Sequence, residues 1–402
     1  MEERLDLYAD IDETVAAIND FSGKEEGIRY REFCRQAKAI FQTLEHPFML
    51  STRPSPITLT HRVGIINFKR LLQLNPFVTL WQALAKQFHD PRLQQLFGRY
   101  STYMGSSPYQ APATLMLIAH VEQAGVWKIE GGMYQLVEAM KKLAIKAGVN
   151  FRLGTGVKKI SIKNRAIESI ELDSGEIIET ENVIFNGDHA ALGHGLLGEE
   201  VKFDKYKTKQ SQRSLSAITW SMSAKTSGFP LVHHNVFFGN NYQQEFENIF
   251  KRNKLPNSPT IYVCAQDRND NNDQTTLDKE RLFCLVNAPA VGDHQNFTEQ
   301  MILDCQQEVF QFLSDCGLQI DFANEDCRIT TPNQFEQFFP GTGGGLYGKA
   351  SHGWLASFQR PGSATPIKGL YLAGGSVHPG AGIPMAATSG KLAADRLLQD
   401  QK

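Results

Sequence analysis

A glycine-rich segment near the carboxyl end of the sequence constrains the fold more than any other feature. An apolar stretch at residues 370–373 runs into a loop with four glycines, and Pro384 stands where an Ala-rich helix would begin. Glycine lets a backbone approach a ligand closely, and proline suits the first turn of a helix. The free N–H groups and the dipole at a helix N-terminus favour an anion such as a pyrophosphate. The pattern therefore predicts a strand, a glycine loop and a helix that bind a nucleotide cofactor.

A plain glycine-rich turn between a strand and a packing helix is the alternative interpretation. Four glycines within nine residues exceed what a turn needs, so we favour the cofactor site. The expected contacts come from the loop and the first helical turn, and they are Gly374, Gly375, Ser376, His378, Gly380, Gly382, Ile383, Pro384 and Met385.

A longer part of the sequence resembles a known family. Pro340-Gly-Thr-Gly-Gly-Gly-Leu-Tyr-Gly-Lys-Ala-Ser-His-Gly-Trp354 precedes Phe358-Gln-Arg-Pro361, and the glycine-rich segment follows. In this order the motifs resemble the bacterial carotenoid desaturases, FAD flavoproteins of the phytoene desaturase type. They are most similar to the branch that acts on hydroxylated or methoxylated acyclic carotenoids, such as hydroxyneurosporene and methoxyneurosporene.

The resemblance implies an α/β fold with α+β elements, of the FAD-dependent amine-oxidoreductase type. At 402 residues the chain is long enough for more than one core. We expect a helical region that faces substrate and membrane at 1–127, and the middle segment of the FAD-binding domain at 128–190. A substrate-binding antiparallel sheet with a helix is expected at 191–335, and the C-terminal FAD segment at 336–402.

Hydrophobic periodicity places the individual elements. Phe33, Ala37, Ile40 and Leu44 recur at helical spacing, and Asp90 before a proline is typical of a helix N-cap. Helices are expected at residues 13–19, 28–44, 62–74, 77–88, 113–123, 133–147 and 298–316. Strands are expected at residues 150–153, 157–162, 166–172, 176–179, 183–186, 216–224, 233–238, 260–265, 281–287 and 328–330.

The first βαβ unit of such a fold, with its Gly-x-Gly-x-x-Gly loop, is missing from these residues. One literal match, Gly343-Gly-Gly345-Leu-Tyr-Gly348, follows Phe338-Phe-Pro340 rather than a clean apolar strand. We interpret it as a loop that faces the cofactor or the substrate cavity. A truncated gene product, a separate chain that supplies the segment and a mis-assigned start all remain open. We expect the chain alone to bind FAD weakly.

The resemblance implies desaturation of an acyclic carotenoid at the 3,4 bond of a 1-hydroxy or methoxy derivative. Hydride would pass to FAD, which quinone or oxygen would reoxidise. The alternatives are a carotene isomerase or ketolase on the same scaffold, or an inactive or partner subunit. A lipophilic substrate implies a cytoplasmic protein in peripheral contact with the membrane through the aromatic helices of residues 30–90. A net charge of −2 provides no attraction to nucleic acid.

Three polar side chains are candidates for direct roles. His378, in the cofactor loop, either touches flavin and assists proton movement or fixes the loop by packing. His352 either meets a terminal hydroxyl of the substrate or packs beside Trp354. Arg99 either orients the substrate or forms an ion pair. Because the flavin performs the difficult chemistry, no strong catalytic side chain is required.

Two more cofactor contacts are implied by the resemblance, and a metal site is not expected. Val157 would meet the adenine through its backbone, and Asp188 either contacts the cofactor or caps a turn. Adjacent residues on a strand face opposite sides, so His233 and His234 are not expected to share a metal. The six cysteines form no Cys-x-x-Cys pair.

Overall fold

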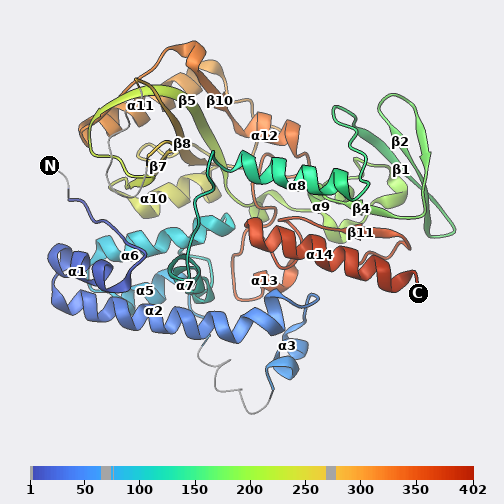
Figure 1. Ribbon diagram of the computed structural model, residues 1–402, viewed down its shortest axis with the longest axis horizontal. Coiled ribbons are helices and arrows are strands. Elements are labelled where there is room, and N and C mark those ends of the chain that lie inside the picture. Colours follow the sequence, from blue (N-terminus) through green and yellow to red (C-terminus); the bar gives the residue numbers. More distant parts are fainter. Residues whose placement is uncertain (1–2, 65–73, 76, 269–277) are drawn as a thin grey trace.

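The computed structural model describes residues 3–64, 74–75, 77–268 and 278–402. Figure 1 shows a helical region beside a large sheet, and a smaller group of strands near the C-terminal helix. This mixture of helices and sheets agrees with the predicted α/β fold. Among the described residues, no helix has the length and apolar character needed to cross a bilayer.

The amino-terminal third is helical and has its own hydrophobic core. Phe33, Phe88 and Phe97 are fully buried there, with the Phe33 ring centroid 5.3 Å from Phe88 and 4.9 Å from Phe97. The predicted stripe through Ala37, Ile40 and Leu44 is buried in the same core. The expected helix at 62–74 falls mostly outside the described residues. The helices are α1 (Ile11–Ser22), α2 (Lys24–Leu44), α3 (Pro56–Val63), α5 (Leu80–Gln87), α6 (Pro91–Gly98) and α7 (Leu117–Gln123).

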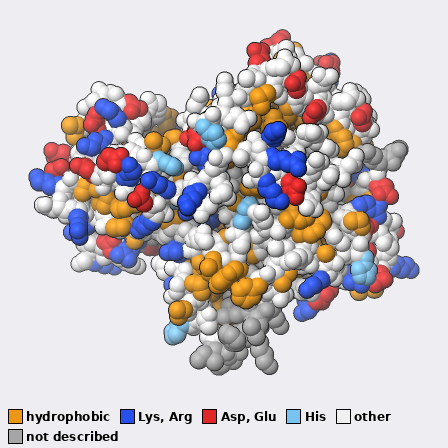
Figure 2. Space-filling view, turned by 180° about the vertical axis from the view of Figure 1, so that it is seen from behind, with side chains coloured by type: hydrophobic (Ala, Val, Ile, Leu, Met, Phe, Trp, Pro, Cys, Tyr) orange, Lys and Arg blue, Asp and Glu red, His pale blue; other side chains and the backbone are white. Residues whose placement is uncertain are grey.

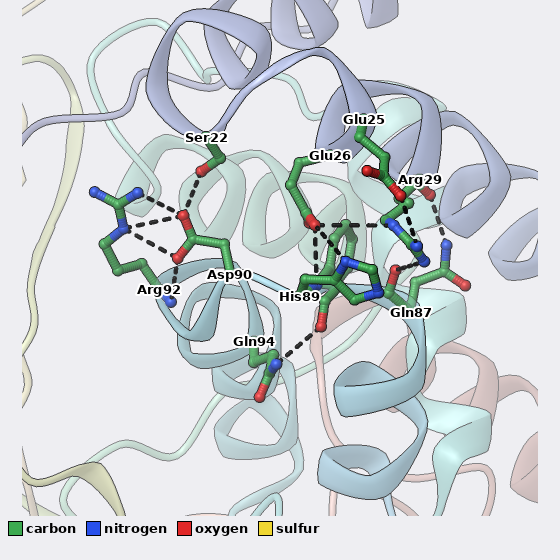
Figure 3. A network of polar contacts seen from close by, with 10 residues as sticks. Ser22, Glu25, Glu26, Arg29, Gln87, His89, Asp90, Arg92 and Gln94 are labelled. Atoms are coloured by element: carbon green, nitrogen blue, oxygen red, sulfur yellow. Dashed lines mark hydrogen bonds and ion pairs between the residues drawn. The ribbon is translucent and has the colours of Figure 1, made fainter.

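A polar network joins the turn between α1 and α2 to the turn between α5 and α6 (Figure 3). Glu26 is buried and accepts a hydrogen bond from the His89 backbone N–H at 3.0 Å. Asp90 accepts from the Arg92 backbone N–H at 2.8 Å and from the Ser22 hydroxyl at 2.7 Å. The predicted N-cap at Asp90 is therefore confirmed. These carboxylates line a surface hollow together with Ser22 and Arg92, and the second oxygen of Glu26 is buried without a described partner.

The large sheet is antiparallel and has the strand order β10-β5-β8-β7-β6, with β9 pairing the far half of β5. Helix α11 (Glu299–Asp315) contributes Val309 and Leu313 to a core that includes Trp220 of the sheet. Alternate strand residues face this core, because successive side chains point to opposite sides. The strands are β5 (Ser216–Gly228), β6 (His234–Phe237), β7 (Ile261–Ala265), β8 (Glu280–Ala288), β9 (Leu318–Asp321) and β10 (Cys327–Thr330).

Two small sheets are separate from the large sheet. An antiparallel sheet contains β1 (Val157–Lys163), β2 (Ala166–Leu172) and β3 (Ile177–Glu179). A parallel pair contains β4 (Val183–Phe185) and β11 (Leu370–Leu372). The predicted strand at 150–153 is wrong, because that stretch has no neighbouring strand to pair with in the described chain. The remaining helices are α8 (Tyr134–Lys146), α9 (His189–Gly193), α10 (Tyr242–Glu247), α12 (Pro332–Phe338), α13 (Ala356–Gln359) and α14 (Ile383–Asp400).

Candidate functional site

The predicted strand, glycine loop and helix are present at the carboxyl end. Strand β11 ends at Leu372, and the Ala373 N–H continues the pairing by donating to Phe185 O at 3.0 Å. Helix α14 begins at Ile383 with Pro384 in its first turn. Its N-cap is Gly382, and no hydrogen bond from a described side chain caps this end. The first N–H groups of α14 are therefore available to an anionic group.

The glycines of this loop differ in their surroundings. Gly374 has φ +113°, and a Cβ there would come within 2.7 Å of the Asn186 Oδ1. A Cβ on Gly375 would meet nothing closer than Ala381 Cα at 3.7 Å, and a Cβ on Gly382 would meet nothing within 4 Å. Open space therefore borders two bare backbone positions at the start of the helix. The residues present fit a nucleotide cofactor such as FAD, since a flat or phosphorylated group can approach there.

Three segments that are distant in sequence converge beside this loop. A Cβ on Gly348 would lie 2.7 Å from the Ser376 Cβ and 3.2 Å from the Asp188 Oδ2. Asp188 also caps helix α9, because its carboxylate accepts from the Ala190 N–H at 2.8 Å. The turn after β4 thereby brings a carboxylate to the cofactor loop. Asp188 and Ser376, both predicted contacts, lie together here.

Arg360 is a functional candidate that the sequence interpretation missed. Its buried guanidinium donates to Gly375 O at 2.9 Å, and to Tyr347 O and Lys349 O at 3.1 Å. Burial lowers the pKa of Arg360 to about 10, and the nearby Asp188 carboxylate opposes that fall. The side chain thus fastens the 347–349 backbone to the cofactor loop. Its only signal in the sequence was its place in the Phe358-Gln-Arg-Pro361 motif.

His378 is buried at the far end of the cofactor loop. Its Nε2 lies 3.0 Å from both Phe48 O and Ser51 O, and since carbonyls only accept, this nitrogen carries the proton. Burial lowers the pKa of His378 to about 4, so the ring is neutral near pH 7. Its Nδ1 is buried without a hydrogen-bond partner in the described structure. These contacts favour the interpretation that His378 anchors the loop to the short π-helix Glu45–Met49.

His352 also has a structural environment. Its Nε2 accepts a hydrogen bond from the Ser107 backbone N–H at 3.0 Å, and burial lowers the pKa of His352 to about 4. The ring packs edge-on against Phe250, with centroids 4.7 Å apart. Trp354 instead lies 5.2 Å from the Phe77 ring. Packing is thus the better-supported role, although its partner is Phe250 rather than the expected Trp354.

Arg99 lies in a cluster of tyrosines between the helices and the large sheet. Among the described residues, no carboxylate lies within 4 Å of its guanidinium, so the expected ion pair is wrong. The guanidinium sits 5.4 Å from the Tyr103 ring centroid and 5.3 Å from that of Tyr262, and it donates to the Tyr103 hydroxyl at 3.2 Å. The Tyr100 and Tyr103 hydroxyls lie 2.7 and 3.2 Å from the Glu122 carboxylate. We call Arg99, Tyr100, Tyr103, Glu122 and Tyr262 the tyrosine–arginine cluster.

A side chain of the protein holds the turn that leads into the literal Gly-x-Gly-x-x-Gly match at 343–348. The Glu336 carboxylate accepts from the N–H groups of Gly341 at 2.8 Å, Gly344 at 3.0 Å and Thr342 at 3.2 Å. These donors are therefore satisfied by a side chain of the preceding helix, α12. Gly348, at the far end of the match, faces Asp188 and Ser376 as described above.

The remaining predicted contacts are more dispersed. Ile383 and Pro384 are exposed at the start of α14, whereas Met385 packs against the helical core. Gly380 approaches Arg360 and Met104. Val157 begins β1 on the three-stranded sheet, where it is paired with Leu172 and is 40% exposed. The structure thus gathers Asp188 and the loop residues but places Val157 on a different sheet.

Comparison with known proteins is consistent with this site. Residues 78–398 match the family model described as flavin containing amine oxidoreductase. The hydroxyneurosporene desaturase of Rubrivivax gelatinosus is 48% identical over 99% of this chain and 75% of its own length. The 1-hydroxycarotenoid 3,4-desaturase of a Flavobacterium species is 33% identical over 77% of this chain and 63% of its own length. A solved putrescine oxidase variant covers 92% of this chain and 76% of its own, at 12% identity and a TM-score of 0.52, which shows a shared fold alone.

Proposed function

Because the chain belongs to the flavin containing amine oxidoreductases, within the carotenoid desaturases, we propose that it desaturates an acyclic carotenoid with FAD as cofactor. The observation that carries the proposal is the 48% identity to a hydroxyneurosporene desaturase over nearly the whole chain. The cofactor loop supports it, since its bare glycines and uncapped helix are suited to FAD. Desaturation is also favoured over isomerisation or ketolation, because the relatives reported above are named desaturases.

The chain's own residues position and isolate the reacting groups. When bound, the flavin supplies a hydride acceptor. Arg360 holds the Gly375 carbonyl, and His378 holds the other end of the loop against the helical region. Both side chains keep the loop in one geometry before any ligand arrives, which reduces the cost of ordering it on binding. Arg360 is a donor held by carbonyls, and burial, which lowers the pKa of His378 to about 4, makes its unpartnered Nδ1 a weak base.

Product analysis tests the reaction. The protein is supplied with a 1-hydroxylated acyclic carotenoid in a carotenoid-free host that contains FAD. We expect a product that has lost two hydrogens, with its new double bond at the 3,4 position. A product of unchanged hydrogen count would show an isomerase, and a product with added oxygen would show a ketolase.

We propose that the tyrosine–arginine cluster binds the oxygen at the end of the substrate. Arg99 interacts electrostatically with Glu122 and Glu245 but has no carboxylate within 4 Å among the described residues, and a hydroxyl or methoxy oxygen can accept a hydrogen bond from it. The charge of Arg99 also opposes the burial that raises the pKa of Tyr347, so the cluster lies within electrostatic reach of the loop that carries Gly348. We propose that the cluster forms the polar end of the substrate site, on the side of the loop that carries Tyr347.

The Arg99→Met variant tests this role. A hydrogen bond to a charged group contributes roughly 1.5–3 kcal/mol, so kcat/KM for the hydroxylated substrate should fall about 10- to 100-fold. The value for the matching hydrocarbon without the hydroxyl should change little, and Arg99→Lys should recover part of the loss. Equal losses on both substrates would rule out recognition of the terminal oxygen.

We propose further that a βαβ segment, on the same or another polypeptide, completes the cofactor site. Val137, Met140 and Leu143 share one face of α8, and each is more than half exposed. No residue of α8 is buried. The outer edge of β4 has no strand partner in the described chain, whereas Ala364 bridges the outer edge of β11 at Tyr371, and an open edge favours the addition of a strand. A βαβ unit would supply both a strand for the open β4 edge and apolar side chains for the exposed face of α8.

Flavin retention tests that proposal. The purified chain is passed through gel filtration with FAD, alone and after co-expression with the part of the Rubrivivax gelatinosus relative that it does not cover. Retained flavin is expected only in the second case, and Leu143→Asp in α8 should abolish it. Ile177→Asp, at an exposed apolar position on β3, is the matched control. Stoichiometric flavin on the chain alone would contradict the proposal.

Membrane contact is proposed through an apolar surface at one end of the helical region. Ile57 on α3 is 84% exposed and Phe77 is 76% exposed, and Phe77 pairs with the half-exposed Trp354. Figure 2 shows hydrophobic side chains gathered beside the grey residues on the lower part of that face. An apolar patch of this kind inserts into the interfacial layer of a bilayer. There the protein would meet its lipophilic substrate and, as a further proposal, a quinone that accepts the electrons, with oxygen as the alternative.

Liposome co-sedimentation tests the membrane surface. The variant Ile57→Glu/Phe77→Glu should pellet less with phosphatidylcholine–phosphatidylglycerol vesicles than the parent protein does. The variant Ile177→Glu should behave like the parent. Unchanged sedimentation of the double variant would exclude this surface. Reoxidation of the reduced enzyme by a quinone without oxygen would identify the electron acceptor.

A further inference from the structure

His233, His234 and Cys264 form a compact cluster at the free edge of the large sheet. Strand β6 is the last in the sheet order, and His234 lies directly opposite Cys264 of β7. The centroids of the two imidazole rings are 4.5 Å apart. The expectation that the rings face opposite sides is wrong, because β6 begins only at His234 and His233 precedes it. One ligand atom from each of the three side chains lies within 4.8 Å of the others.

The hydrogen bonds around His233 prepare it to bind a metal ion. Its Nδ1 lies 3.3 Å from Arg268 O, and because a carbonyl only accepts, the proton is on Nδ1. The lone pair is then on Nε2, which is 3.8 Å from the Cys264 Sγ. Metal-binding histidines commonly donate their second nitrogen to a backbone carbonyl, which fixes the tautomer and the ring orientation. The same contacts would also suit a simple hydrogen bond from the thiol to the imidazole.

The surroundings of His234 and Cys264 are also typical of metal-binding side chains. The His234 Nδ1 is 2.7 Å from the Tyr262 hydroxyl, a polar contact of the kind that orients a metal-binding imidazole. Burial raises the pKa of the Cys264 thiol, and a hydrogen bond with Tyr262 and the positive charge of Lys128 oppose that rise. A metal ion would displace the thiol proton, as it does at other thiolate sites.

We propose that His233, His234 and Cys264 bind a zinc ion that fastens β6 to β7. Two imidazoles and one thiolate are a ligand set that zinc accepts, with a water molecule as the fourth ligand. The ligands come from the start of one strand and the middle of the next, so the ion would hold the exposed edge of the sheet in register. This site is separate from the cofactor loop and differs from the expectation of no metal site.

Cobalt(II) is the spectroscopic probe, used on untagged full-length protein that a chelator has stripped of metal. We expect one equivalent to bind, with the intense d–d bands of a tetrahedral site and a thiolate-to-cobalt charge-transfer band. Zinc should displace the cobalt and raise the Tm of the protein. The absence of saturable binding at micromolar metal, or binding without a charge-transfer band, would overturn the proposal.

Two ligand variants and one control separate metal binding from a thiol–imidazole hydrogen bond. Cys264→Ser and the surface variant His234→Asn should each weaken cobalt binding by about 100-fold or more, while circular dichroism checks that both are folded. Cys327→Ser alters another partly buried cysteine of the same sheet and should bind cobalt as the parent does. Parent-like binding by folded Cys264→Ser would refute the site.

Discussion

Gly374 and Gly375 are neighbours in the sequence but are glycines for different reasons. Gly374 has positive φ and faces Asn186, so any side chain there would be strained in the folded protein itself. Gly375 has open space at the Cβ position, so the constraint comes from outside the chain. Substitution can therefore distinguish a glycine required by the fold from a glycine required by the ligand.

The Gly375→Ala variant should weaken FAD binding by tenfold or more in the flavin-loaded protein. Its free energy of unfolding should stay within about 0.5 kcal/mol of the parent value, because the added methyl group meets no described atom closely. Flavin fluorescence titration and urea unfolding measure the two quantities. The control is Gly390→Ala in the interior of α14, which should keep FAD and gain about 0.5–1 kcal/mol of stability. Unchanged FAD affinity in Gly375→Ala would place the cofactor elsewhere.

The role of a single residue could be predicted from the sequence when its hydrogen-bond partners are close to it in the chain. Asp90 was predicted as an N-cap because a cap bonds to residues just after it. Arg360 could not be foreseen, since its role is defined by three carbonyls that only the folded chain brings together. The contacts of Arg99 were mispredicted for the same reason, because its tyrosine neighbour Tyr262 comes from the large sheet.

At the scale of elements, the sequence pattern located the strands and helices more reliably than it predicted which strands pair with each other. The strand, loop and helix at residues 370–398 appear as expected, because a short apolar stretch, glycine and proline act locally. The parallel pairing of β11 with β4 joins segments that no local pattern connects. The failed strand at 150–153 had suitable residues but lacked a neighbour, and a strand needs a partner to form.

The loop at 341–344 depends on one carboxylate from α12. The Glu336→Ala variant leaves the N–H groups of Gly341, Thr342 and Gly344 without their acceptor. Because unsatisfied buried donors are costly, we expect a loss of about 2–3 kcal/mol in the free energy of unfolding. Urea denaturation provides the measurement, and the exposed Glu325→Ala is the control, expected to change stability by less than about 0.5 kcal/mol.

The turn before α6 is a second element that depends on a single side chain. Hydrogen bonds from Arg92, and then from Ser22, lower the pKa of Asp90 to about 2 against the effect of burial. Asp90→Ala removes the cap of α6 and should cost about 1–2 kcal/mol. Thermal unfolding followed by circular dichroism tests this, with the exposed Asp20→Ala on α1 as the control. A loss no larger than that of the control would show that the network in Figure 3 contributes little.

For the whole molecule, buried histidines predict how stability changes with pH. Burial lowers the pKa of His189 and His378 to about 4 in the folded protein, against 6.5 when exposed. As pH falls below 6.5, the unfolded chain binds protons that the folded chain does not, so stability is lost between pH 6.5 and 4. At pH 5 each histidine should cost about 2 kcal/mol relative to pH 7.5.

Urea unfolding at pH 7.5 and pH 5 measures this dependence. The His189→Gln variant removes one titrating group, so the stability difference between the two pH values should become smaller by about 2 kcal/mol. His61→Gln on the exposed side of α3 is the control and should leave the pH dependence unchanged. A parent-like difference in His189→Gln would show that this histidine does not titrate on unfolding.

The pairing of β4 with β11 also determines when the cofactor site can form during synthesis of the chain. Strand β4 ends at Phe185, but its partner starts only at Leu370, so β4 is made long before the strand that it needs. Contacts so distant in sequence form late, after the intervening helices and sheet have had time to fold. The turn at Asp188 therefore waits until the cofactor loop after Leu372 has been translated. Flavin loading is thus a late step, which keeps a half-made chain from holding a redox-active group.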